Sequence, residues 1–331
     1  MPKVLTSVHI EFKGRSPATE MMEQTGLEVV EQPPRPGWPD DETREKLVGI
    51  DGLLAGSENL NASTLDQADS LKVIARNGVG YDKVDLDYCT ERGIVVTYTP
   101  GAMSDAVADQ VFALLLGMTR QLVSGDQTVK KAGKYDVPIG EDLSAMTLGL
   151  VGCGRIGAEV VRRALGFRMR VLVHDPWIDD SVIQEMGAES VDRETLLGAS
   201  DAITLHTPMT DQNKDMVDRS FLSAMKAGSY LINTARGGLV DEAALIETLQ
   251  SGHLQGAGLD CQATEPPTGT SLDLVRLPQV LALPHTGSKT NAARERMSIW
   301  AAQSIVDVFQ GRVPQYVVNT DVLERLDLQT A

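Results

Sequence analysis

The chain has 331 residues, 42% of them hydrophobic and 23% charged, a composition typical of a globular protein with two domains or one large α/β unit. Its 46 acidic and 30 basic residues give a net charge of −16. Such a surface repels phosphate and anionic lipid, so we expect no nucleic-acid and no membrane partner. The three scattered cysteines favour neither a disulfide framework nor a metal site. The N-terminal segment shows no signal-peptide pattern, so we expect a cytoplasmic protein.

The first hundred residues alternate short apolar runs with helical patterns. Apolar runs at residues 4–8, 52–55, 72–75 and 94–97 predict strands, and residues 42–48 and 86–92 predict helices. The proline-rich segment 32–39 predicts an exposed loop, because proline lacks a backbone donor and clashes inside a helix. This part of the chain therefore predicts an α/β unit.

From about residue 146 the alternation becomes regular. The predicted strands are residues 147–151, 170–174, 202–206, 229–234, 256–259 and 280–283. The helical patterns between them cover residues 156–165, 181–186, 194–197, 219–225 and 242–249. Strands and helices that alternate at this spacing predict a parallel sheet with right-handed crossovers.

Two long helices are also predicted. The first runs from Asp105 to Val123 and has apolar residues around nearly its whole circumference. It is either a central core helix or a helix packed against a second subunit, and we favour the second, which predicts a homodimer. The other helix, about residues 291–310, stops before Gly311, a common C-cap residue.

Residues 152–157 fit the pattern G-x-G-x-x-G, directly after one predicted strand and at the start of a helix. Gly152 permits a tight turn, Gly154 lets the backbone approach a pyrophosphate, and Gly157 allows close packing of helix and strand. The first helical turn, with Arg155 and Ile156, then offers N–H donors to the anion.

The next predicted strand ends at Asp175, where a carboxylate would meet the ribose hydroxyls and repel a 2′-phosphate. This favours NAD over NADP as the cofactor. The alternative is a glycine turn that binds nothing.

Polar residues follow three further predicted strands. Because parallel strands end at one edge of a sheet, where open α/β sheets bind ligands, we expect these residues at a common edge. The segments are residues 233–241, 258–260 leading to 265–267, and 283–288.

With the glycine motif, these segments resemble the D-2-hydroxyacid dehydrogenase family, which includes phosphoglycerate, glyoxylate/hydroxypyruvate and D-lactate dehydrogenases. The resemblance covers nearly the whole chain. It implies a doubly wound parallel-sheet Rossmann domain, which binds NAD, inserted in a smaller flavodoxin-like α/β substrate domain. The Rossmann domain would comprise residues 100–287, and the substrate domain residues 1–99 plus 288–331.

By position, the resemblance implies Arg236 as the catalytic arginine, Glu265 as its acidic partner and His285 as the acid/base histidine. A guanidinium can hold a substrate carboxylate bidentately. An imidazole can exchange the hydroxyl proton, and a carboxylate beside it would fix its tautomer and favour its protonated form. The resemblance also implies further cofactor contacts, besides Arg236 and His285, at Pro176, His206, Thr207, Pro208, Thr234, Ala235, Asp260 and Gly287.

The segment 75–85 resembles the family's substrate loop, and implies that Arg76, Asn77, Gly78, Val79 and Gly80 bind the substrate. The N–H groups around the two glycines could form an anion nest for the substrate carboxylate; an ordinary glycine turn is the alternative. The chain departs from the family pattern at Gly56, at residues 99–104 and at Asp109. These departures leave the substrate's side chain open.

We therefore predict an NAD-dependent oxidoreductase that interconverts a small, anionic D-2-hydroxy acid and its 2-keto acid. One alternative is a non-catalytic NAD(H)-sensing protein; another is a dehydrogenase of the same fold with an unusual donor such as phosphite. Cys153, inside the glycine turn, is either a small residue that fits or a redox-sensitive thiol whose pKa the helix N-terminus lowers.

Overall fold

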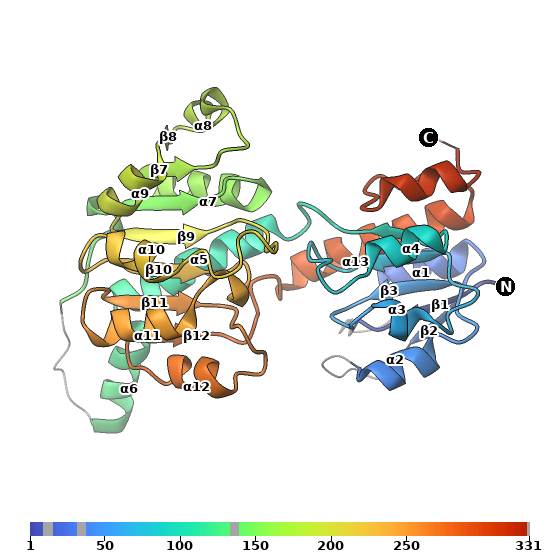
Figure 1. The fold of residues 1–331 in the computed structure, drawn as a ribbon, viewed down its shortest axis with the longest axis horizontal. Helices are drawn as coiled ribbons and strands as arrows, with labels where there is room; N and C mark the ends of the chain where they lie inside the picture. The colour runs from blue at the N-terminus through green and yellow to red at the C-terminus, as the bar shows by residue number, and fades with distance from the viewer. Residues whose placement is uncertain (9–15, 32–37, 133–138, 330–331) are drawn as a thin grey trace. The chain divides into compact units, whose positions relative to one another are not determined.

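The computed structural model describes residues 1–8, 16–31, 38–132 and 139–329. The chain divides into two compact units, which we call unit 1 (Met1–Met103 and Lys289–Ala331) and unit 2 (Ser104–Ser288). Each unit is built on its own parallel sheet (Figure 1). Most of the predicted proline-rich loop, residues 32–37, lies outside the described residues.

The described part of unit 1 contains a five-stranded sheet of order β2-β1-β3-β4-β5, in which all neighbours are parallel. This is the flavodoxin-like strand order, which confirms the predicted fold of this part. The strands are β1 (Lys3–Thr6), β2 (Glu28–Glu31), β3 (Gly52–Ala55), β4 (Val73–Arg76) and β5 (Val95–Thr97).

Both faces of this sheet are covered, because successive residues of a strand point to opposite sides. Leu53 of β3 lies in a buried apolar cluster with Leu47, directly after α2, and with residues of α3 and α4, whereas Leu54 lies in a cluster with residues of α1 and α13. The helices are α1 (Pro17–Gln24), α2 (Asp40–Lys46), α3 (Ala62–Leu65), α4 (Leu86–Glu91), α13 (Asn291–Phe309) and the 3₁₀ helix η3 (Thr320–Arg325).

Unit 2 contains a seven-stranded parallel sheet of order β12-β11-β10-β9-β6-β7-β8. From β6 the chain first winds through β7 to β8, and then continues on the other side of β6 from β9 to β12. This is the Rossmann order with a seventh strand, which confirms the predicted doubly wound sheet. The strands are β6 (Thr147–Val151), β7 (Arg170–His174), β8 (Glu189–Ser190), β9 (Ala202–Leu205), β10 (Tyr230–Asn233), β11 (Gly256–Leu259) and β12 (Val280–Ala282).

Helices cover both faces of this sheet as well. Leu148 and Leu150 of β6 pack with α5 and α7, whereas Ile203 and Leu205 of β9 pack with α9, α10 and α11. The helical segments are α5 (Ser104–Thr119), α6 (Leu122–Ala132), η1 (Leu143–Ala145), α7 (Arg155–Gly166), α8 (Asp180–Glu185), α9 (Arg193–Ala199), α10 (Arg219–Ala224), η2 (Gly237–Leu239), α11 (Glu242–Gln250) and α12 (Gly269–Val275). The change of winding direction between β6 and β9 leaves a crevice for a ligand at the carboxyl ends of these strands.

The prediction of a single helix from Asp105 to Val123 is wrong, because two helices cover this region. Helix α5 ends at Thr119, Gln121 has a φ of 50°, and α6 then leaves at an angle of 55°. The Thr119 carbonyl accepts a hydrogen bond from the N–H of Glu141, at 3.1 Å. A distant segment therefore takes the place of the next helical turn.

Within the described residues, no single helix combines the length and hydropathy needed to cross a membrane. Helices α5 and α6 meet that test only when they are taken together, across their bend.

Candidate active site

The glycine motif forms the turn between β6 and α7, and its three glycines have different surroundings. Gly152 has a φ of +89°, and a Cβ there would lie 2.7 Å from the carbonyl oxygen of His206. A Cβ at Gly157 would lie 2.9 Å from the carbonyl oxygen of Gly152. A Cβ at Gly154 would meet nothing within 4 Å. The turn is therefore closed on its protein side and open at Gly154, beside the N-terminus of α7, as a bound pyrophosphate requires.

Asp175 lies at the end of β7, next to this turn. One carboxylate oxygen accepts the N–H of Cys153 at 2.7 Å, and the other accepts the N–H of Trp177 at 2.9 Å. A pocket of about 310 Å³ adjoins it, to which Asp180 and Asp192 also contribute carboxylates. These three acidic groups disfavour a 2′-phosphate by charge repulsion, so the pocket suits the ribose of NAD.

The structure does not support the hypothesis that Cys153 is a redox-sensitive thiol. Burial, and secondly the charge of Asp175, raise the pKa of the Cys153 thiol to about 11. This is the opposite of the lowering predicted from the helix N-terminus. The residue is only 2% exposed and is a small side chain that fits the turn.

His285 and Glu265 form a direct pair at the carboxyl edge of the unit 2 sheet. Nδ1 of His285 lies 2.9 Å and 3.1 Å from the two carboxylate oxygens of Glu265. Burial alone would raise the pKa of Glu265, but the hydrogen bond and charge of His285 outweigh it, with help from the N–H of Gln262 and the charge of Arg236. The pKa of Glu265 is therefore lowered, which favours its anionic form, and this carboxylate contacts Nδ1 rather than Nε2 of the imidazole.

Asp260 fixes the backbone that carries this histidine. Its buried carboxylate accepts the N–H of Thr286 at 2.9 Å and the N–H of Gly287 at 2.7 Å, while its carbonyl accepts the N–H of His285 at 2.8 Å. His285 itself has a φ of 52°, which is uncommon for a residue with a side chain. Asp260 thus acts here as a support for His285, a role that the sequence did not suggest.

Arg236 lies in the loop after β10, close enough for its charge to lower the pKa of Glu265. Asn233, 1% exposed, donates to the Arg236 carbonyl at 2.8 Å and accepts the N–H of Ala235 at 2.9 Å. A Cβ on Gly237 would lie only 2.0 Å from the carbonyl carbon of Gln262. The loop of Arg236 and the loop of Glu265 therefore touch, and Gly237 makes this contact possible.

Sequence reasoning did not find the supports Asn233 and Gly237, although both lie in a segment that it had singled out. An asparagine at a strand end, two residues before an N–H that its side chain can accept, is a common turn signal. The contact with Gln262 has no local signal, because it joins residues far apart in the chain.

The remaining predicted cofactor residues lie at the same carboxyl edge. Thr207 and Pro208 follow β9, and the buried hydroxyl oxygen of Thr234, after β10, has no partner among the described residues. Desolvation lowers the pKa of His206 to about 3, so this ring is neutral and unsuited to donate a proton. Three histidines lie at this edge, His174, His206 and His285, and in the described structure only the ring of His285 is hydrogen-bonded to a carboxylate.

The predicted substrate loop lies in unit 1. Hydrogen bonds hold its backbone to neighbouring segments. The N–H of Asn77 donates to the Ala55 carbonyl, and the N–H of Thr99 donates to the Gly78 carbonyl. Arg76 donates through Nε to the Gly80 carbonyl at 3.0 Å. Side-chain oxygens of Asn77 and Thr99 are buried without a partner among the described residues. Unsatisfied polar atoms at the carboxyl edge of a sheet are consistent with a ligand-binding role for this loop, which stays a prediction.

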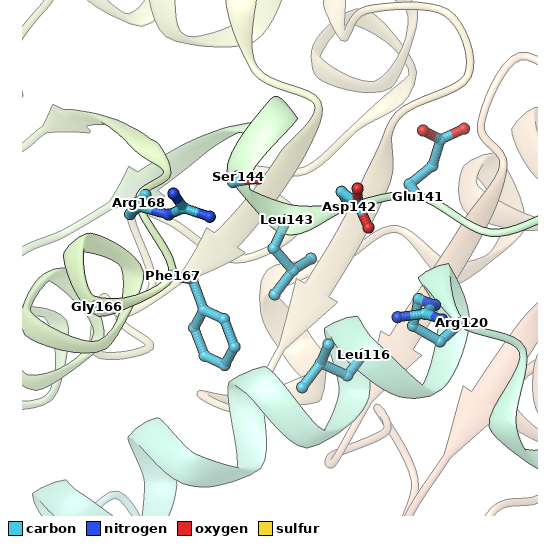
Figure 2. A pocket seen from close by; sticks show the side chains of 9 residues that line it. All are labelled: Leu116, Arg120, Glu141, Asp142, Leu143, Ser144, Gly166, Phe167 and Arg168. Atoms are coloured by element: carbon cyan, nitrogen blue, oxygen red, sulfur yellow. The ribbon is translucent and has the colours of Figure 1, made fainter.

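A second pocket of unit 2, of about 370 Å³, lies at the other end of its strands, before β6 and β7. Figure 2 shows Leu116, Leu143 and Phe167 turned toward its centre, with Arg168 on one side and Arg120 on the other. None of the predicted site residues lines it.

The fold and the residues at its edge are those of a dinucleotide-dependent dehydrogenase. Residues 112–287 match the family model described as "D-isomer specific 2-hydroxyacid dehydrogenase, NAD binding domain". The chain is 38% identical to the glyoxylate reductase of Thermococcus litoralis, over 97% of this chain and 98% of the relative.

The chain is also similar to solved protein structures. A protein of Thermus thermophilus matches with a TM-score of 0.86 at 39% identity, over 96% of this chain and 99% of the other. A D-lactate dehydrogenase of Aquifex aeolicus, solved with NAD and lactic acid, matches with a TM-score of 0.80 at 28% identity, over 98% of each chain.

The chain belongs to the D-isomer specific 2-hydroxyacid dehydrogenase family. It is an NAD-dependent oxidoreductase that interconverts 2-hydroxy acids and 2-keto acids, as the sequence predicted.

Proposed function

We propose that this chain reduces a small 2-keto acid of the glyoxylate class with NADH, and oxidises the corresponding 2-hydroxy acid in reverse. The similarity to a glyoxylate reductase over nearly the whole of both chains supports this substrate class. The observation that carries the proposed mechanism is the contact between Nδ1 of His285 and Glu265, at 2.9 Å.

In this proposal Arg236 binds the substrate carboxylate through its planar fork and so orients C2. NADH supplies the hydride that reduces C2. His285 donates the proton from Nε2 to the carbonyl oxygen as it gains negative charge, and takes it back in the reverse reaction. Glu265 holds the ring by Nδ1, so Nε2 is the nitrogen that exchanges the proton. The glycine turn, Asp175 and the hydroxyl of Thr234 would hold the cofactor.

The test is a panel of glyoxylate, hydroxypyruvate, phosphohydroxypyruvate, pyruvate and sulfopyruvate, each with NADH and with NADPH. We expect turnover of the smallest keto acids, with NADH preferred because of Asp175. A protein that binds NADH tightly but reduces none of these acids would instead be a sensor. Phosphite-dependent reduction of NAD would favour the unusual-donor alternative.

We also propose a cytoplasmic homodimer. Ten of the sixteen residues of α5 are buried within unit 2, so α5 offers little surface to a partner. The exposed apolar side chains lie beyond its end, at Leu122 (57% exposed), Val123 (49%) and Val129 (48%). We therefore place the contact at the C-terminal end of the predicted region from Asp105 to Val123. Sedimentation analysis of the wild type and of Leu122→Asp tests this, and a wild-type monomer at micromolar concentration would refute it.

A further inference from the structure

The loop that carries Glu265 is held by a buried carboxylate from another part of unit 2. Glu242, at the start of α11, is 8% exposed. One of its oxygens accepts the N–H of Ala263 at 2.9 Å, and the other accepts the hydroxyl of Ser271 at 2.6 Å. Hydrogen bonds to a carboxylate are among the stronger ones in proteins. Glu242 thus joins three segments of the chain.

Ser271 extends this connection to the next residue of the loop. Its hydroxyl oxygen accepts the N–H of Thr264 at 3.2 Å while it donates its proton to Glu242. Ser271 is 2% exposed, in the first turn of α12. Two consecutive N–H groups of the loop, at Ala263 and Thr264, are therefore fixed directly before Glu265. We call Glu242 and Ser271 the brace.

The brace is buried, and these hydrogen bonds join it to the loop rather than to any predicted substrate or cofactor residue, so its effect on the reaction must pass through the loop. Within that loop the N–H of Gln262 donates to Glu265 at 3.1 Å, which gives the carboxylate a second fixed contact besides His285. Glu265 is 38% exposed, so without such contacts its side chain would be free to turn into solvent.

We propose that Glu242 and Ser271 are positioning residues: they hold the backbone of residues 263–264 so that the Glu265 carboxylate stays on Nδ1 of His285. This inference rests on the proposed function and extends it to residues that act on the reaction only through the loop. The physical reason is that an acid/base pair works only in its aligned geometry, so a small displacement of the loop lowers the rate.

The test is Ser271→Ala, which cuts the link to Thr264 and leaves one Glu242 oxygen without its partner. We expect kcat for glyoxylate reduction to fall about tenfold, which corresponds to one hydrogen bond of about 1.4 kcal/mol, while the Kd of NADH changes less than twofold. In a Glu265→Gln background the same substitution should change kcat less than twofold, because its target is already removed.

The matched control is Ser200→Ala. Ser200 is also a fully buried serine of unit 2, and its hydroxyl donates to the Leu196 carbonyl at 2.7 Å. This variant should lower the melting temperature and leave kcat within twofold. If Ser271→Ala lowers kcat by the same factor with and without Glu265, or no more than Ser200→Ala does, the proposal is overturned.

A second readout separates this proposal from the proposed function, because it needs no turnover. The Nδ1–H proton of His285, observed by NMR and assigned by its loss in His285→Gln, reports the bond to Glu265. It should weaken or disappear in Ser271→Ala and in Glu265→Gln, and persist in Ser200→Ala. If the wild type reduces no keto acid, the proposed function fails. The NMR signal still shows whether the brace positions Glu265. An unchanged signal in Ser271→Ala overturns the proposal that the brace positions Glu265, even if the enzyme is active.

Discussion

The loops of Arg236 and Glu265 touch at Gly237. A substitution there tests whether the reaction rate depends on this close contact between the two loops. In Gly237→Ala the new Cβ would lie 2.0 Å from the carbonyl carbon of Gln262 and 2.3 Å from the N of Ala263. Ordinary contact begins at 3.4 Å, so the two backbones must separate by about 1.4 Å. A misplacement of about 1 Å can cost 10²-fold in rate. Overpacking of this kind also costs about 1–3 kcal/mol of stability.

Gly238→Ala is the matched control, because its Cβ would meet only the thioether end of Met209, at 2.6 Å. That side chain is 39% exposed and can move aside. Steady-state kinetics with glyoxylate and NADH should give a kcat at least 10²-fold lower for Gly237→Ala, and within threefold of wild type for Gly238→Ala. The Kd of NADH should change little in Gly238→Ala, and by a smaller factor than kcat in Gly237→Ala. If the two variants were equally active, Arg236 would not depend on this contact.

Three further outcomes follow from the same geometry. His285→Gln should lower kcat by about 10²–10⁴-fold and leave the Kd of NADH nearly unchanged, since it removes only proton transfer; normal turnover would exclude His285 as the acid. The folded-state pKa of Glu265 is lowered, so its carboxylate stabilises the protein above the unfolded value of about 4.3 and this contribution is lost as the pH falls through the folded value. At pH 7, Glu265→Gln should therefore melt at a lower temperature than wild type. The loss of unfolding free energy should be less than about 1 kcal/mol because Glu265 is partly exposed, and the two melting temperatures should converge as the pH falls below the lowered pKa of Glu265. With a pKa of about 11, Cys153 should resist iodoacetamide at pH 7 in the folded protein, as mass spectrometry can show, and rapid labelling would contradict its burial.

The sequence pattern predicted the parallel sheet of unit 2 because its inner strands have strong local signals, whereas the flavodoxin-like sheet of unit 1 was implied by the family resemblance. β6, β7 and β11 lie where their apolar runs placed them. The strands that it missed, β2 and β8, are edge strands of four and two residues, and both begin with glutamate. Half-exposed edge strands bury too little surface to need an apolar run, so their sequences resemble loops.

Of the two hypotheses for Cys153, the redox-sensitive thiol shows how tertiary contacts override a local rule. The thiol does lie just before a helix N-terminus, which by itself lowers a thiol pKa. In the folded chain, however, Asp175 comes within hydrogen-bonding distance of the N–H of Cys153, at 2.7 Å, and the thiol loses its water. The charge of Asp175 therefore acts on the thiol pKa with the opposite sign to the helix N-terminus, and the sequence interval of 22 residues between them gives no local signal.

The candidate site likewise combines residues that the sequence could identify with contacts that only the folded structure shows. Strand order grouped the segments of Arg236, Glu265 and His285 at one edge, and the family resemblance implied the role of each residue. The contacts that hold them join residues 20 to 29 positions apart: His285 with Glu265, Thr286 with Asp260, Ser271 with Glu242. Spacing cannot predict such contacts, because they depend on how closely two loops approach. Glu242 illustrates this: in the sequence it is an acidic residue in a first helical turn, which the helix dipole alone explains. Only its burial and its contacts with Ala263 and Ser271 distinguish it from Glu194, which is exposed in the first turn of α9. Glu194→Gln should therefore leave kcat unchanged, whereas Glu242→Gln should lower it.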